Sequence, residues 1–214
     1  MKRRDFLLAA GAAAGSALIR PSSLFAAPAS AAGGKKRLAL IGTGVRGISF
    51  WGKTLIQNYS GQLEFVGLCD NNPGRVAYAK QYMEADCPTF TNFTEMMDKT
   101  RPDLLIVTTV DATHDEYIVK GLQMGADVIT EKPMTTDEVK CRKILRAEKQ
   151  TGRKLHVGFN YRYGAHFTKI KELLASDRLG RITSVDFHWY LNTDHGASYF
   201  RRWHGIRKCS GTLL

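Results

Sequence analysis

Short apolar runs alternate with stretches of helical periodicity through residues 37–159, and this alternation predicts a parallel α/β sheet. Between the runs, apolar residues recur at helical spacing, as Ile48, Trp51 and Leu55 do. Runs that are apolar throughout are typical of strands buried on both faces, with helices covering the two sides of the sheet. In chain order, the runs are RLALI, EFVGLC, DLLIV, DVIT and KLHVGF.

Residue types mark several helix boundaries within this pattern. Asn72 followed by Pro73 is typical of a capping residue and the first helical position. A helix is predicted over residues 136–151, where Gly152 ends it, and another is predicted to end near Gly125.

The pattern changes near residue 159. Residues 185–191 alternate strictly between apolar and more polar positions, which predicts a strand of an open, mainly antiparallel sheet. This stretch follows a helical pattern over 167–174 and a turn at Gly180. We therefore expect a second domain over 159–214. Because one strand cannot bury its aromatic face alone, we expect that domain to be incomplete in this sequence.

Residues 1–31 have the composition of an export signal. A basic start precedes a mild apolar run over 6–19, and the sequence APASA offers small residues for cleavage after Ala31. The pair Arg3-Arg4 is typical of a twin-arginine signal, which predicts export of the folded protein to the periplasm. A general secretory signal or a membrane anchor is the alternative. However, the 14-residue run is shorter than the about 20 residues that a span needs, so no stable membrane insertion is expected after processing.

Charge and cysteine content narrow the function classes. The net charge is +11 at pH 7, and the chain stays basic without its first 31 residues, but the basic side chains form no long block. We expect a solvated surface and no nucleic-acid partner. The four cysteines lie far apart without CxxC spacing, so no metal site is predicted, and Cys69 and Cys141 are expected to pack in the core.

A glycine-rich sequence, GTGVRG, follows the first strand directly and opens the first helix. In such a G-x-G-x-x-G loop the first glycine permits a tight turn, the second lets backbone N–H groups approach a pyrophosphate, and the third allows close helix–strand contact. The helix N-terminus adds partial positive charge for the phosphates. A plain glycine turn is the alternative. The candidate cofactor-binding residues of this loop are Gly42, Thr43, Gly44, Val45, Arg46 and Gly47.

An acid ends the second strand, roughly 20 residues beyond the glycine loop. At this position Asp70 would accept hydrogen bonds from an adenosine ribose, which favours NAD over NADP. Asn71 is a further candidate contact, and Arg75 would reach a 2′-phosphate, so NADP stays open as the less favoured cofactor. The alternative role for Asp70 is to cap the next helix. Strand, glycines, helix and acid together predict a Rossmann-type, doubly wound domain over 32–158.

Two further strand ends carry polar residues to the same edge of the sheet, where ligands of open parallel sheets bind. The sequence TTVDATH brings Thr109 and His114, and the sequence EKP brings Glu131 and Lys132. Pro133 fixes the backbone after the lysine, as a trans or a cis bond.

The ordered set of GxGxxG, strand-ending Asp, His, Glu-Lys-Pro and then GFNYRY resembles the Gfo/Idh/MocA family of nucleotide-dependent oxidoreductases over residues 36–214. The resemblance implies a Rossmann domain followed by an α/β domain with an open, mainly antiparallel sheet. It also implies oxidation or reduction of hydroxyl and carbonyl groups of sugars, inositols and related compounds.

By this resemblance, Lys132 would lie beside the nicotinamide and hydrogen-bond the reacting oxygen, with Glu131 orienting it. His114 would be a second catalytic residue near the cofactor, and Asn160 and Arg162 would face the cleft between the domains. The alternatives are a surface lysine in a loop for Lys132 and a helix-capping role for His114.

Residues 195–205, HGASYFRRWHG, interleave aromatic and basic side chains. We interpret them as a sugar-binding or anion-binding loop in which Tyr199 or Trp203 stacks on a sugar ring and Arg201 or Arg202 meets an anion. An oligomer contact or a strand surface is the alternative.

The leading hypothesis is an exported, NAD-dependent oxidoreductase acting on a sugar or polyol, which forms a homo-oligomer when full length. One alternative is an NAD-dependent glycoside hydrolase that oxidises, eliminates and re-reduces its substrate. Another is a non-catalytic nucleotide-binding fragment. The family's later segment, which supplies an Asp or His opposite the lysine, is missing beyond CSGTLL, so the chain alone is expected to be inactive.

Overall fold

The computed structural model describes residues 34–190 and 192–211. The chain divides into two units, residues 1–34 and 35–214. The predicted export signal therefore lies outside the described residues, as do Leu191 and residues 212–214.

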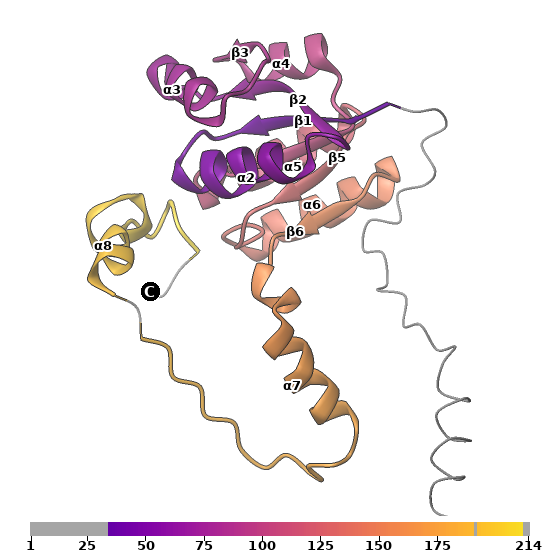
Figure 1. The fold of residues 1–214 in the computed structure, drawn as a ribbon, viewed down its shortest axis with the longest axis vertical. Helices are drawn as coiled ribbons and strands as arrows, with labels where there is room; N and C mark the ends of the chain where they lie inside the picture. Colours follow the sequence, from indigo (N-terminus) through magenta and orange to yellow (C-terminus); the bar gives the residue numbers. More distant parts are fainter. Residues whose placement is uncertain (1–33, 191, 212–214) are drawn as a thin grey trace, which may run out of the picture. The chain divides into compact units, whose positions relative to one another are not determined.

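The second unit contains a six-stranded sheet in which each strand runs parallel to its neighbours (Figure 1). The strand order is β3-β2-β1-β4-β5-β6. The chain adds β2 and β3 on one side of β1 and then crosses over to add β4, β5 and β6 on the other side. This confirms the Rossmann-type doubly wound sheet that the apolar runs predict, and it places the switch point at the end of β1. The strands are β1 (Lys36–Ile41), β2 (Leu63–Cys69), β3 (Thr89–Phe90), β4 (Leu104–Val107), β5 (Asp127–Thr130) and β6 (Leu155–Val157).

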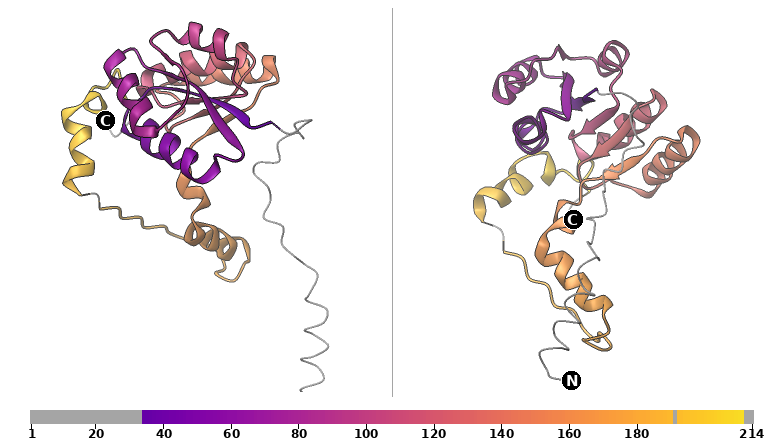
Figure 2. Two further views of the ribbon diagram at one scale, coloured as in Figure 1. Left: turned by 45° about the horizontal axis from the view of Figure 1, so that its top comes forward. Right: turned by 45° about the vertical axis from the view of Figure 1, so that its right-hand side comes forward.

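Helices cover both faces of the sheet (Figure 2). The Asn72 side chain accepts the Arg75 N–H as predicted, but the last helix of the sheet domain begins at Glu138, because Asp137 caps it by accepting the Lys140 N–H. The helical elements are a π-helix η1 (Gly47–Lys53), α2 (Thr54–Tyr59), α3 (Pro73–Met83), α4 (Phe93–Thr100), a 3₁₀ turn η2 (Asp111–Thr113), α5 (His114–Gln123) and α6 (Glu138–Thr151).

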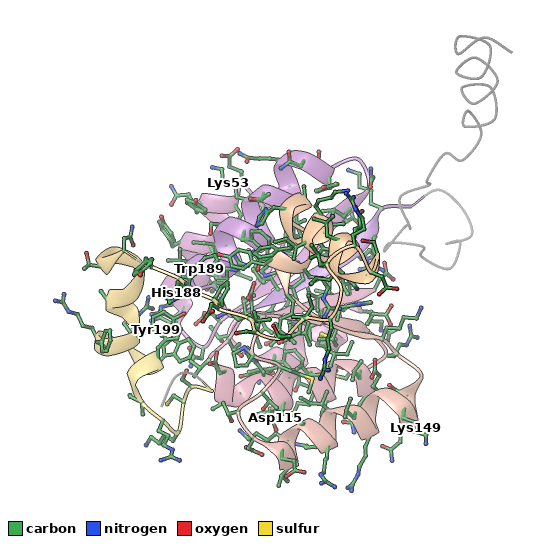
Figure 3. The ribbon with its side chains drawn as sticks, turned by 90° about the horizontal axis from the view of Figure 1, so that it is seen from below. Lys53, Asp115, Lys149, His188, Trp189 and Tyr199 are labelled. Carbon is green, nitrogen blue, oxygen red and sulfur yellow. The ribbon has the colours of Figure 1, made fainter. Side chains whose placement is uncertain are left out.

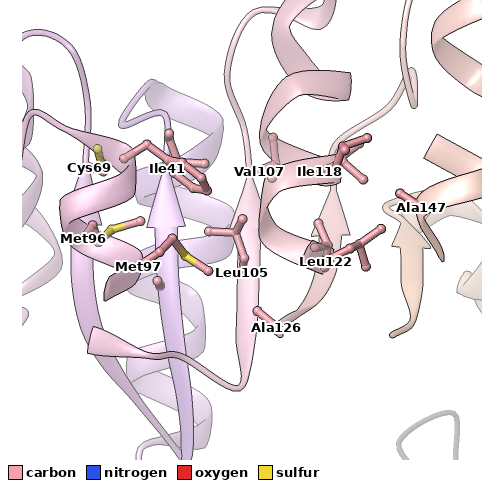
Figure 4. Close-up of a cluster of buried hydrophobic side chains, with 14 of the residues drawn as sticks. Ile41, Cys69, Met96, Met97, Leu105, Val107, Ile118, Leu122, Ala126 and Ala147 are labelled. Carbon is pink, nitrogen blue, oxygen red and sulfur yellow. The ribbon is translucent and has the colours of Figure 1, made fainter. Parts of the chain in front are cut away.

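The core consists of two apolar clusters, one on each face of the sheet. Leu38 and Leu40 of β1 point into one cluster with η1 and α3, while Ala39 and Ile41 point into the other with α4, α5 and α6. Figure 4 shows the second cluster around Ile41. Because the strands bury both faces, their positions are fixed from both sides, which holds the strand ends rigid where the polar residues emerge.

The predicted strand over residues 185–191 is wrong for the described residues. Residues 182–190 have no regular secondary structure, and Figure 3 labels His188 and Trp189 in this stretch. Val185 is 81% exposed and Tyr190 is 92% exposed. An alternating pattern becomes a strand only beside a partner strand, and the described part of the chain pairs none with it. The loop predicted over 195–205 is also wrong, because most of it is helical. The elements after the sheet are η3 (Asn160–Tyr163), α7 (Ala165–Ala175), α8 (Thr193–Arg201) and η4 (Trp203–Gly205).

Cys69 is buried, as expected, whereas Cys141 is only half-buried. Within the ranges that the structure describes, no helix is both long and apolar enough to cross a bilayer.

Candidate functional site

The glycine loop has the three geometries that a dinucleotide loop needs. Gly42 has φ +89°, and a β-carbon on it would lie 2.7 Å from the Thr108 backbone. A β-carbon on Gly47 would lie 2.5 Å from the Gly42 carbonyl oxygen. At Gly44, in contrast, no heavy atom lies within 4 Å of that position. The loop is therefore tight at both ends and open in the middle, where a phosphate would approach the backbone; a nucleotide fits this space.

Asp70 organises this loop from the end of β2. Its carboxylate is 8% exposed, and Oδ2 accepts hydrogen bonds from the N–H of Thr43 at 2.8 Å and from its hydroxyl at 3.0 Å. Oδ1 accepts one hydrogen bond, from the Asn72 N–H at 3.0 Å. Since each carboxylate oxygen has two lone pairs, one acceptor position on Oδ1 is left for a ribose hydroxyl. Asn71 and Arg75 are exposed beside it.

His114 is 1% exposed and supports two loops from the start of α5. Its Nδ1 lies 2.9 Å from the Pro133 carbonyl oxygen and its Nε2 lies 3.1 Å from the Thr109 carbonyl oxygen. Both partners only accept, and a neutral imidazole has one N–H to donate. With both nitrogens facing backbone, His114 holds the loop after β4 against the loop after β5. Its predicted catalytic role stays a prediction.

Glu131, directly after β5, is a buried carboxylate with three donors around it. Oε1 accepts from Arg46 Nε at 2.6 Å and from Trp51 Nε1 at 2.7 Å, and Oε2 accepts from the Lys132 backbone N–H at 3.3 Å. Glu131 is 7% exposed, whereas the Arg46 side chain is 42% exposed. The link to Lys132 therefore runs through its backbone. Trp51 was missed as a site residue, because its helical spacing with Ile48 indicates a core position.

Lys132 is exposed at the carboxyl end of β5, and the bond from it to Pro133 is cis. Among the described residues, its ammonium group has no hydrogen-bond or ion-pair partner. The side chain is thus available to a ligand at the strand edge that also carries the glycine loop and Asp70.

Asp111 is a further buried acid at this edge that sequence reasoning missed. It is 5% exposed, and its Oδ2 accepts from the Ser210 hydroxyl at 3.1 Å and from the Gly211 N–H at 3.2 Å. The Ala112 N–H donates to the Cys209 carbonyl oxygen at 3.0 Å. Residues 209–211 therefore return to the loop after β4. An acid at a strand end, within TTVDATH, was the available signal.

The predicted substrate residues after the sheet lie on separate elements. Asn160 and Arg162 are exposed on η3, and Arg201 is exposed on α8. The His204 ring lies 3.6 Å from the Trp203 ring, stacked on it, and 5.2 Å from the Tyr199 ring, so one face of the indole is covered. Their substrate roles stay predictions. Nor do three His, Cys, Asp or Glu side chains come together as metal ligands in the described ranges.

The thiol beside Asp70 is not a nucleophile. Burial, together with the negative charges of Asp70 and Glu95, raises the pKa of Cys69 to about 12. Burial likewise raises the pKa of Cys87 to about 11. Because the thiolate is the reactive form, neither cysteine contributes covalent chemistry near neutral pH.

Comparison with known proteins finds relatives that are named as oxidoreductases or dehydrogenases. The YteT protein of Bacillus subtilis strain 168 is 43% identical over 182 residues, which is 83% of this chain and 42% of YteT. The inositol 2-dehydrogenase of Gluconacetobacter diazotrophicus is 30% identical over 149 residues, which is 68% of this chain and 44% of that protein. The chain thus spans less than half the length of these relatives.

Solved structures show the same fold. The WlbA dehydrogenase from Chromobacterium violaceum, solved with NADH and UDP-GlcNAcA, superposes with a TM-score of 0.72 at 24% identity, covering 82% of this chain and 50% of that one. The myo-inositol dehydrogenase from Lactobacillus casei, solved with NAD(H) and myo-inositol, gives 0.63 at 22% identity, covering 69% and 43%.

A profile of the Gfo/Idh/MocA family, described as an oxidoreductase family with an NAD-binding Rossmann fold, matches residues 36–159. That range holds the whole six-stranded sheet, the glycine loop, Asp70 and the Glu-Lys-Pro sequence. The chain therefore belongs to the Gfo/Idh/MocA oxidoreductase family, and its sheet domain is that family's NAD-binding Rossmann fold.

Proposed function

We propose that the whole protein is an NAD-dependent oxidoreductase that acts on a hydroxyl group of a sugar or polyol. The observation that carries this proposal is the exposed Lys132, whose ammonium group is unpaired within residues 34–190 and 192–211, at the sheet edge that also holds the open glycine loop. The inositol 2-dehydrogenase among the relatives supports a polyol or sugar as the substrate class.

The residues of this chain divide the work between binding and proton handling. The glycine loop and the N-terminus of the first helix hold the pyrophosphate, and Asp70 accepts from the ribose through Oδ1. When bound, NAD would accept the hydride from the substrate carbon on its nicotinamide ring. The Lys132 ammonium donates a hydrogen bond to the reacting oxygen and stabilises its developing negative charge, while the Asp or His that the family's later segment supplies would accept the hydroxyl proton. His114 and Glu131 keep the loop of Lys132 in place.

Export through the twin-arginine route to the periplasm is part of this proposal, and its support is the Arg3-Arg4 pair and apolar run in the sequence. Folding before export would let the protein take up its cofactor in the cytoplasm. A reporter fused to residues 1–31 should reach the periplasm, and Arg3→Lys with Arg4→Lys should retain it in the cytoplasm. Export of the double variant at the unaltered rate contradicts this route.

Binding of the cofactor is tested first. A saturating concentration of NAD, about 100 times its Kd, should stabilise the folded protein by about 2.7 kcal/mol, and thermal unfolding measures this as a rise in Tm. The whole protein should then form NADH with a sugar or polyol from a substrate panel. No rise in Tm with either NAD or NADP contradicts the proposal. Cleavage of a nitrophenyl glycoside without accumulation of NADH would indicate transient oxidation and re-reduction instead.

A further inference from the structure

Two donors, one from the glycine loop and one from η1, meet at the buried carboxylate of Glu131. Arg46 belongs to the glycine loop and Trp51 to η1, whereas Glu131 follows β5, so the contact bridges across the end of β4. Both hydrogen bonds end on the same oxygen, Oε1, at 2.6 and 2.7 Å. The loop that would hold the pyrophosphate is thus bonded directly to the residue before Lys132.

The local backbone places Trp51 for this contact. The segment Gly47–Lys53 is a π-helix, in which the Thr54 N–H reaches back five residues to the Ser49 carbonyl oxygen. A π-turn rotates the side chains relative to an α-helix, and such turns are frequent at functional sites. Gly158, after β6, leaves space for the indole, since a β-carbon on it would lie only 3.1 Å from the Trp51 ring.

The charges around Glu131 explain how its contacts with Arg46 and Trp51 affect Lys132. A buried carboxylate needs a counter-charge and hydrogen bonds, and Arg46 and Trp51 supply them. The second oxygen is then directed to the Lys132 backbone N–H. Without these two donors, the nearest cation in sequence that can neutralise Glu131 is the ammonium group of Lys132. An ion pair with Glu131 would draw that ammonium group away from the substrate.

We propose that Trp51 and Arg46 are positioning residues for Lys132, acting through Glu131, so that the cofactor loop and the lysine loop behave as one unit. The idea deepens the proposed function and rests on it for the role of the lysine, but the mechanical link exists in the free protein. Binding of NAD at the glycine loop would therefore order the lysine loop as well.

Amide hydrogen exchange of the Lys132 N–H tests the link directly. Trp51→Phe keeps an aromatic ring and removes the indole N–H, and it should speed exchange at Lys132 about tenfold, the effect of one hydrogen bond to a charged group. Trp189→Phe is the matched control, because Trp189 contacts Tyr161 and Phe187, and it should leave this amide unchanged. In the whole protein, Trp51→Phe should lower kcat while the Kd of NAD stays within about twofold.

Equal exchange rates in Trp51→Phe and Trp189→Phe overturn the proposal, as does a loss of NAD affinity as large as the loss of kcat. Should Trp51→Phe fail to fold, the unaltered protein decides the question: added NAD must slow exchange at both Gly44 and Lys132, and slowing at Gly44 alone overturns the link. If NAD slows neither amide, the proposed function fails. The comparison of the two Trp variants without NAD still tests the hydrogen bond.

Discussion

The Nδ1 atom of His114 lies 2.9 Å from the carbonyl oxygen of Pro133, so a fully buried imidazole on α5 supports the loop that carries Lys132. The other ring nitrogen faces the Thr109 carbonyl oxygen. The lysine loop is thereby held from two sides, by His114 after the proline and by Glu131 before the lysine.

Replacing His114 by Phe should destabilise the protein, because the aromatic ring is kept while the imidazole N–H that donates to the part-buried carbonyl oxygen of Pro133 or Thr109 is lost. The free energy of unfolding should fall by about 1–3 kcal/mol in urea titrations. His156→Phe, at an exposed position on β6, is the control and should change it by less than about 0.5 kcal/mol. Equal effects of the two variants would refute the supporting role.

Two glycines of the same loop should respond in opposite ways to alanine. Gly44→Ala meets no atom within 4 Å and should keep or slightly raise stability, yet its methyl group occupies the phosphate space and should weaken NAD binding more than tenfold. Gly47→Ala places a β-carbon 2.5 Å from the Gly42 carbonyl oxygen and should lower the Tm by several degrees. Calorimetry gives both the NAD affinity and the Tm. Undiminished NAD affinity in Gly44→Ala would place the cofactor elsewhere.

Asp70→Ser should weaken NAD binding and reduce the factor by which the protein binds NAD more tightly than NADP. The substitution removes both the ribose acceptor and the negative charge that repels a 2′-phosphate, so the ratio of NADP to NAD affinity should rise at least about tenfold. Fluorescence titration with the two reduced cofactors measures this ratio. Asp86→Ser, at an exposed position, is the control and should leave the ratio of the two affinities unchanged. An unchanged ratio in Asp70→Ser would show that Asp70 does not contact the ribose.

Alkaline pH should destabilise the fold through its buried thiols. The pKa of Cys69 is raised from 9.0 to about 12 and that of Cys87 from 9.0 to about 11, so above pH 9 the unfolded chain releases protons that the folded chain keeps. Their stability contribution is complete below pH 9 and is lost as pH rises towards 11 and 12, by about 1.4 kcal/mol per pH unit for each thiol.

Urea unfolding of the protein and of Cys69→Ala between pH 8 and pH 10.5 measures this loss. The alanine variant starts less stable, but its free energy of unfolding should fall less steeply above pH 9. Parallel curves for the two proteins would show that Cys69 is not the titrating group.

The sequence predicts the sheet and its ligand edge well, because these depend on local signals. Apolar runs bounded by helical stretches indicate the strands. Gly42 is required by its positive φ and Gly47 by its close contact with the Gly42 carbonyl oxygen, whereas Gly44 leaves the space that a phosphate would use. The Asn72 cap is likewise a local hydrogen bond that the sequence displays.

What the sequence does not predict depends on partners distant along the chain. Trp51 and Glu131 lie 80 positions apart in the sequence, and Asp111 and Ser210 lie 99 positions apart. The residues around each of them in the sequence do not indicate which partner it contacts. The alternation over 185–191 is typical of a strand with one apolar face, but a strand also needs a neighbouring backbone, which a period of two residues cannot supply.

The most direct test of the account is turnover by the Lys132→Met variant of the whole protein. Methionine keeps the length of the side chain and removes the charged donor, so the Kd of NAD should stay within about twofold while kcat for sugar or polyol oxidation falls about 10²–10³-fold. Turnover at the unaltered rate, with NAD still bound, would contradict the assignment of Lys132 as the group that meets the reacting oxygen.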